Sequence, residues 1–364
     1  MDETKRRIDE VDIAKGIGIA LVVIGHCLPE DSKLRLVIYS FHMPLFFFLS
    51  GFVLNSKWIL KSRQNKKIVD SKLLSWYLLF SFIYLAFDFV VKKCILGQYG
   101  YKILAWECYQ TISLYGINVL WFISSLIVAK VIVTLNVNRM TGTKDGFILA
   151  ILLFFVGGGV SYFLQEPSNE LLKVFWYPVS NIVRSLAMSS FVLIGYELKN
   201  FLIRTAFDYR ARRLFLLILV CLCIWMPMCI VSYKANLVID IHKLKFGIAP
   251  ITFISSICGI VCVICLSILI KRYLHLLMKG FVFLGKNSLL IMLTHEHLML
   301  RQLATNLANL VFDGWLGYLL TFIIILLSEI VLCSVISGPL TSLVGCLTKK
   351  LDDVNKKADL FSDL

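Results

Sequence analysis

Long apolar stretches recur along the whole chain and are separated by short polar segments. A helix that crosses the hydrocarbon core of a bilayer needs about 20 such residues. We therefore predict an all-α integral membrane protein, a polytopic bundle of about ten transmembrane helices. The stretch 101–116 is apolar but short and dotted with polar residues, which favours an interfacial or re-entrant helix. The ten predicted spans lie near residues 12–28, 36–55, 72–91, 118–137, 147–164, 176–198, 213–233, 247–270, 281–300 and 315–337.

Lysine and arginine residues gather in alternate loops between these spans. With the N-terminus inside, the loops on its side hold 23 of them and the opposite loops hold 10. Because cytoplasmic loops carry the excess of positive charge, both termini are predicted to be cytoplasmic, in a multi-pass protein of the bacterial cytoplasmic membrane. We expect a single membrane domain over 1–340 and a polar cytoplasmic tail over 341–364.

The composition changes this picture little. Of 364 residues, 59% are hydrophobic and 16% charged, whereas an ordinary soluble domain carries about 25% charged residues. The net charge of +14 would suit a nucleic-acid partner only if the basic residues shared one folded face. They follow the membrane topology instead, so membrane lipids are predicted partners and nucleic acid is not. The eleven cysteines fall mostly in apolar runs, where we interpret them as small buried hydrophobes.

Histidines stand at similar depths in three predicted spans. His26 lies near the external end of the first span, His42 about two turns into the second, and His295 near the external end of the ninth. Ionisable residues inside a membrane are costly and usually mark a functional path. Imidazole has a pKa near neutrality, so these three are candidate catalytic residues, above all His26 as a general base. Each also fits a hydrogen-bonded role in helix packing. Trp121 and Arg184 are expected in the same chamber.

Lys15 precedes His26 by eleven residues. In a helix this spacing puts both side chains on nearly one face, roughly 16 Å apart. The pair predicts a ligand with an anionic head at the cytoplasmic end and a reactive end near the external side. The same spacing also fits a Lys15 that reaches lipid phosphates or pairs with Asp12.

Further cations stand on the predicted cytoplasmic side. The loop 57–72 is strongly basic, and Arg63 and Lys72 are candidates for holding a phosphate-rich cofactor. Lys286, expected at the start of the ninth span, is a third candidate. The predicted cofactor-binding residues are thus Asp12, Lys15, Arg63, Lys72 and Lys286. No metal is predicted, because the histidines of the sequence THEH at 294–297 are two residues apart and point in different directions on a helix.

Two segments near the start carry a family resemblance. DIAKGIGIALVVIGH at 12–26 and FHMPLFFFLSGFVLN at 41–55 resemble the opening of the membrane-bound acyltransferase family 3, especially its fucose 4-O-acetylase-like branch. The similarity continues through SKLLSWYLLF, LWFISSL, FVLIGYEL and LGKNSLLIMLTH, in order along the chain. The resemblance maps the basic residue and histidine of the family onto Lys15 and His26, and two further family histidines onto His42 and His295.

The resemblance implies an O-acetyltransferase that moves an acetyl group from cytoplasmic acetyl-CoA to a hydroxyl of an extracytoplasmic or lipid-linked glycan. Lys15 and Lys72 would meet the phosphates of the cofactor, and His26 would deprotonate the sugar hydroxyl. His42 or Arg184 is expected to stabilise the oxyanion. Trp121 and Phe122 would offer an apolar face to the sugar ring, unless they belong to an interfacial aromatic belt.

The chain departs from the family pattern in places. Trp76-Tyr77 stands where Pro-Tyr is usual, and the basic residues of 57–72 match the arginine pairs of the family loosely, which puts cofactor contacts there in question. We also expect no counterpart of the external hydrolase-like domain that is fused to some family members, so direct transfer to the acceptor, or a separate partner such as glycan-assembly machinery, is expected. A transporter or flippase is the alternative class, because bundles with intramembrane charges also build transporters.

Overall fold

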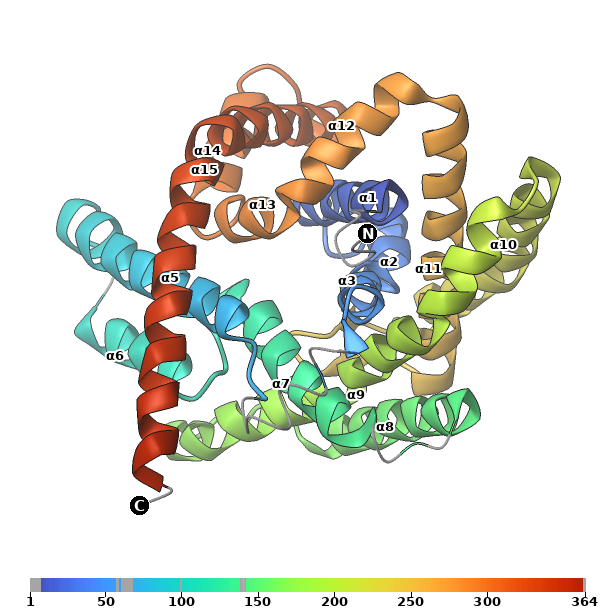
Figure 1. Ribbon diagram of the computed structural model, residues 1–364. Helices are drawn as coiled ribbons and strands as arrows, with labels where there is room; N and C mark the ends of the chain where they lie inside the picture. The colour runs from blue at the N-terminus through green and yellow to red at the C-terminus, as the bar shows by residue number, and fades with distance from the viewer. Residues whose placement is uncertain are drawn as a thin grey trace.

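The computed structural model describes residues 8–56, 59, 68–98, 100–137, 140 and 142–362, with side chains to 354. Across these residues the chain is almost entirely helical, and its one sheet is a two-stranded hairpin. The N-terminal helix lies near the middle of the bundle, and the later helices surround it (Figure 1). The elements are α1 (Asp9–Cys27), α2 (Lys33–Tyr39), α3 (His42–Phe52), α5 (Ser71–Phe87), the π-helix η2 (Asp88–Ile95), α6 (Tyr101–Ile112), α7 (Leu120–Val137), α8 (Thr143–Phe163), α9 (Glu170–Arg204), η3 (Ala206–Asp208), α10 (Ala211–Lys234), β1 (Ile239–Asp240), β2 (Lys245–Phe246), α11 (Ala249–Tyr273), α12 (His275–Lys286), α13 (Ser288–Thr294), α14 (Leu300–Asn309) and α15 (Gly314–Ser362).

The all-α membrane architecture is confirmed. Among the described residues, eight helices are long and apolar enough to cross a bilayer, or nine if α12 and α13 form one bent span. Helix α1 is not among them, because Asp9, Glu10, Asp12 and Lys15 occupy its first two turns. The count of ten spans and the sidedness of the termini stay predictions. Helix α6 has only 12 residues, as expected for a segment too short to span.

Two of the predicted spans are broken where sequence patterns show continuous apolar runs. The second divides at Ser40 and Phe41 into α2 and α3, and Phe41 has φ −145° and ψ −18°. The ninth divides at Asn287, where α12 and α13 meet at an angle of 63°. Helix α13 then ends at Thr294, so His295 and His297 lie in the turn after the helix. The first break places His42 at the start of α3, and the end of α13 places His295 just after a helix, where both rings can face a cavity.

The last helix is much longer than the apolar pattern predicts. A span ending near residue 337 was expected, but α15 is 49 residues long and runs from Gly314 to Ser362. Its apolar part packs along α5 and α14 (Figure 1). The polar segment 341–362 therefore prolongs a helix that begins in the bundle.

Two glycines allow α1 to approach α12 closely. A Cβ on Gly16 would lie 2.1 Å from the carbonyl oxygen of Phe281, and one on Gly285 would lie 1.8 Å from that of Asp12. Any side chain there would push the helices apart. This contact brings Lys15 and Lys286, the neighbours of the two glycines in sequence, to one place in the fold.

Candidate active site

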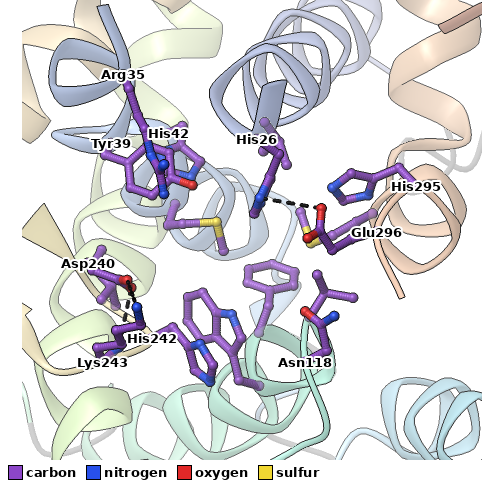
Figure 2. Close-up of a pocket in the computed structure, with 17 residues that line it drawn as sticks. His26, Arg35, Tyr39, His42, Asn118, Asp240, His242, Lys243, His295 and Glu296 are labelled. Atoms are coloured by element: carbon purple, nitrogen blue, oxygen red, sulfur yellow. Dashed lines mark hydrogen bonds and ion pairs between the residues drawn. The ribbon is translucent and has the colours of Figure 1, made fainter. Parts of the chain in front are cut away.

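A cavity of about 260 Å³ lies where the ends of α1, α7 and α13 meet α2, α3 and the β1–β2 hairpin. We call it the histidine pocket, and Figure 2 shows side chains from all these elements pointing into it. Three of the predicted catalytic residues line it together. Its lining is Val22, His26, Arg35, Tyr39, His42, Met43, Asn118, Val119, Trp121, Phe122, Asp240, Ile241, His242, Lys243, Met292, His295 and Glu296.

His26 faces a carboxylate that the sequence analysis did not single out. Its Nδ1 lies 3.6 Å from Oε2 of Glu296 (Figure 2). Arg301 holds this carboxylate from behind, donating from Nε to Oε2 at 2.7 Å and from Nη2 to Oε1 at 2.9 Å. This distance is just beyond hydrogen-bond range, so the carboxylate faces the ring without a direct bond to it. In the tautomer that carries its hydrogen on Nδ1, toward Glu296, Nε2 of His26 is the basic nitrogen.

His42 and His295 are fixed differently from His26. Nδ1 of His42 donates to the carbonyl of Ile38 at 2.9 Å, and Nδ1 of His295 donates to that of Ile291 at 2.8 Å. A carbonyl only accepts, so in the neutral ring Nε2 of each is an acceptor. Either histidine becomes an oxyanion donor only when protonated. The predicted role of His42 in stabilising the oxyanion therefore requires a protonated ring.

Two ring nitrogens in the pocket wall lack partners. Nε2 of His295 and Nε2 of His242 are buried and have no hydrogen-bond partner among the described residues. Burial, together with the nearby charges of Arg184 and Lys243, lowers the pKa of His242 to about 3, so its ring is neutral. Buried polar atoms are normally satisfied, and an exception calls for a partner. A ligand with hydroxyl groups would supply one.

His26, His295 and Glu296 also form a group of metal-ligand type. One donor atom from each lies within 4.8 Å of the others. Both oxygens of Glu296 already accept hydrogen bonds from Arg301, however. The carboxylate is thus engaged with a cation of the chain itself, and the absence of a metal stays a prediction.

Trp121 and Phe122 of α7 also line the histidine pocket. The Trp121 indole stacks on the His242 ring, with centroids 5.6 Å apart and planes 10° apart. Aromatic faces of this kind suit the C–H face of a sugar ring, and stacking by His242 fixes the indole in one orientation. His242 belongs to the short hairpin, which no pattern in the sequence predicted.

Arg184 lies behind the pocket wall and is fully buried. Its guanidinium donates to the Ser125 hydroxyl at 2.8 Å and to the carbonyl of His242 at 3.0 Å. It also donates to the carbonyl of Tyr115 and to Oδ1 of Asn181. Arg184 therefore ties the hairpin to α7 and α9, and its contact with substrate stays a prediction.

A second cavity, of about 380 Å³, lies at the other end of the same helices. We call it the lysine pocket. It brings together Lys15, Lys72 and Lys286, three of the predicted cofactor-binding residues, and adds Lys130. Its full lining is Lys15, Ser50, Val53, Asp70, Lys72, Leu73, Trp76, Leu126, Lys130, Gly285, Lys286, Asn287, Ser288, Leu289, Leu290, Ser337 and Thr341.

Among the residues that the structure describes, Asp70 is the only carboxylate in the lining of the lysine pocket. It caps α5 by accepting from the main-chain N–H groups of Lys72 and Leu73, and it pairs with Nζ of Lys130 at 2.7 Å. Burial raises the pKa of Asp70, but the Lys130 ammonium and these hydrogen bonds outweigh it and hold the pKa below its ordinary value. Four ammonium groups against one carboxylate leave the lysine pocket with a positive surplus.

The remaining predicted cofactor residues fall outside this cavity. Asp12 is buried at the contact between α1 and α12 and does not line the lysine pocket. Arg63 lies outside the described residues. Their cofactor roles stay predictions.

The same helices line both cavities. Helix α1 contributes Lys15 to one and His26 to the other, and α7 contributes Lys130 to one and Trp121 to the other. Helices α3 and α13 also line both. A ligand extended along α1 would thus reach from the lysines to the histidines, roughly 16 Å at the helical rise.

Comparison with known proteins gives one match. A sequence model of the acyltransferase domain of family 3 matches residues 8–337. No curated protein and no solved structure matches. The match covers every residue that lines the histidine pocket and all but Thr341 of those that line the lysine pocket.

Proposed function

The chain belongs to acyltransferase family 3, and from that premise we propose that it is an O-acetyltransferase working across the membrane. Its donor is cytoplasmic acetyl-CoA, and its acceptor is a hydroxyl of an extracytoplasmic or lipid-linked glycan. The lysine pocket takes the donor from one side and the histidine pocket takes the acceptor from the other. The observation that carries the proposal is that the same helices build two cavities, one lined by lysines and the other by histidines and aromatic side chains.

The positive charge of the lysine pocket supports its role as the donor site. Coenzyme A carries several phosphates on one end of a long flexible arm, and ammonium groups suit phosphates as point charges. Lys15, Lys72, Lys130 and Lys286 line one cavity with the single carboxylate Asp70. With the phosphates held there, the arm would place its thioester along α1 toward His26.

The aromatic and polar lining of the histidine pocket supports its role as the acceptor site. The histidine pocket combines two aromatic faces with partnerless Nε2 atoms on His242 and His295. Asp240 and Asn118 add an acceptor and an amide at its rim. Sugars are bound by such a mixture of aromatic faces and hydrogen-bonding groups, because a sugar ring carries C–H faces between hydroxyl edges.

The reaction needs a base, and His26 is placed to supply it. Nε2 of His26 takes the proton from the acceptor hydroxyl as its oxygen attacks the thioester carbonyl carbon, while Glu296 stabilises the imidazolium through Nδ1. The C–S bond then breaks. His26 returns the proton to the departing sulfur, which leaves as a thiol, and the acceptor keeps the acetyl group as an ester. Side chains with N–H donors that line this pocket include Asn118, Arg35, Lys243 and Trp121, and a donor of this kind would stabilise the developing oxyanion.

The test is acceptor-dependent release of CoA thiol by detergent-purified protein, with a mixed pool of cell-envelope glycans as acceptors. Wild-type protein should release thiol and transfer labelled acetyl to glycan, and His26→Ala should not. His275→Gln is the matched control, because His275 is exposed at the start of α12 and lines neither pocket. Wild-type protein that neither binds nor consumes acetyl-CoA would contradict the proposal and favour the transport alternative.

A further inference from the structure

Buried acidic side chains hold the chain where α13 ends. The four residues Thr294-His295-Glu296-His297 run from the last residue of α13 into the turn that follows it, and we call them the 294–297 turn. Its middle pair lines the histidine pocket. The residues on either side of that pair, Thr294 and His297, turn away from the pocket and do not line it. Each is bound by an acidic side chain from a different helix.

On one side the partner is Asp88, the first residue of the π-helix η2. Its Oδ2 lies 2.8 Å from Nε2 of His297, and its Oδ1 lies 2.5 Å from Nζ of Lys92. Asp88 is completely buried and His297 nearly so. The ring of Tyr84 stacks on His297 with centroids 3.9 Å apart, and its hydroxyl donates to the carbonyl of Leu293.

On the other side the partner is Glu329, in α15. The Thr294 hydroxyl lies 2.8 Å from both oxygens of the Glu329 carboxylate. Glu329 is also completely buried. The turn is thus held from η2 and from α15, two elements that contribute nothing to the lining of the histidine pocket.

Such buried carboxylates are expensive, so their position is informative. Burying an acidic side chain costs free energy unless it is paired or hydrogen-bonded, and acidic residues within membrane helices are rare. The chain leaves the turn through Met299, whose φ of 62° lies in the left-handed region. Strained backbone of this kind persists only where its surroundings hold it.

We propose that Asp88 and Glu329 are positioning residues that fix the 294–297 turn, so that Glu296 stays aligned with His26. The inference rests on the proposed function for its catalytic consequence. Neither carboxylate touches the pocket, so each acts through the turn. A small displacement of a catalytic group costs about 10- to 100-fold in rate. His26 and Glu296 are 3.6 Å apart, just beyond hydrogen-bond distance, so a further shift of the turn would separate them.

A double-mutant cycle tests this. Asp88→Asn keeps the shape and removes the charge, and it should lower kcat about tenfold with the KM for acetyl-CoA unchanged. In a Glu296→Gln background the same change should cost nothing further, because the residue that Asp88 positions has lost its function. An Asp88→Asn enzyme with wild-type kcat, or an equal loss in both backgrounds, would overturn the proposal. Glu107→Gln is the matched control, since Glu107 is a buried carboxylate on α6, a helix that lines neither pocket.

Hydrogen exchange gives a second reading that does not depend on turnover. Asp88→Asn, and separately Thr294→Val, should speed amide exchange across 295–301 by roughly fivefold or more, including the Arg301 N–H that closes the turn on His295. Exchange in Glu107→Gln should match wild type there. Unchanged exchange in both test variants would overturn the positioning role. Failure of the proposed function alone would show as wild-type protein without thiol release but with the exchange differences intact.

Discussion

The two ends of α1 show how one helix can serve binding at one end and chemistry at the other. Around Lys15 the polar groups are ammonium ions on long flexible stems, with Asp70 as the one carboxylate in the lining. Around His26 nearly every polar group is fixed by another: Glu296 by Arg301, His42 by Ile38, and His295 by Ile291. Flexible point charges can follow a phosphate chain, whereas proton transfer needs groups held in place. The difference predicts that substitutions at the two ends will affect KM and kcat separately.

The largest effect is expected from His26→Ala. Loss of the base should lower kcat by about 10²- to 10⁴-fold, while acetyl-CoA binding at the lysine pocket stays within about twofold of wild type. Isothermal titration with acetyl-CoA beside a turnover assay checks both halves. Retained turnover would remove His26 as the base, and lost binding would show that the two ends are not separable.

A smaller, complementary effect is expected from Lys15→Met. Removing one of the four described lysines should raise the KM for acetyl-CoA about fivefold and leave kcat nearly unchanged, because one exposed phosphate contact contributes about 1 kcal/mol. The effect should shrink as salt is added. Steady-state kinetics at two ionic strengths measure it. An unchanged KM would favour a Lys15 that reaches lipid phosphates instead of the donor.

Arg184→Lys should affect the acceptor alone. Lysine keeps the charge but cannot make the fork of hydrogen bonds that ties the hairpin to α7 and α9. The acceptor KM should rise roughly threefold to tenfold, as Trp121 and His242 lose their alignment, and the donor KM should not change. A matching rise in the donor KM would mean that Arg184 supports the whole bundle.

The smallest effect is a pH-dependent loss of stability in Asp70→Asn. Pairing with Lys130 holds the pKa of Asp70 below its ordinary value, although burial acts the other way. A lowered folded-state pKa stabilises above the unfolded value, near 3.9, and the benefit is lost as pH falls through the folded value. Asparagine keeps the cap on α5, so the difference from wild type should be about 1 kcal/mol at neutral pH, begin to fall near pH 4 and vanish once the pH is below the lowered folded-state pKa. Thermal unfolding in detergent across pH measures it, and a difference that grows toward low pH would contradict the assignment.

The sequence predicted the parts of this comparison that follow from chain-local pattern. Apolar runs located the helices, and helical spacing put Lys15 and His26 at opposite ends of one face. The cavities that unite Lys72 and Lys286 with Lys15, and His42 and His295 with His26, agree with that geometry. Their chemical roles stay predictions.

What the pattern missed depends on contacts between distant segments. Lys130 lies inside an apolar run, and only the fold shows that it meets Asp70, sixty residues earlier. Glu296 lies between two histidines in the sequence and was not predicted as a site residue. Its orientation depends on the bend at Asn287 and on the hydrogen bonds from Arg301, which only the fold shows. The hairpin with His242 is two residues long in each strand, too short for a sequence period to show.

The most direct test of the central claim uses the sides of a membrane. Protein is reconstituted in liposomes with labelled acetyl-CoA sealed inside, and the impermeant glycan acceptor is added either outside or inside with the donor. Only protein molecules whose lysine pocket faces the inside of the liposome can bind the donor. Molecules inserted the other way do not react, so random insertion does not obscure the result. The account predicts labelled acceptor when the two substrates are on opposite sides and none when they share a side, with His26→Ala inactive in both. Product formed only when both substrates share a side would contradict it.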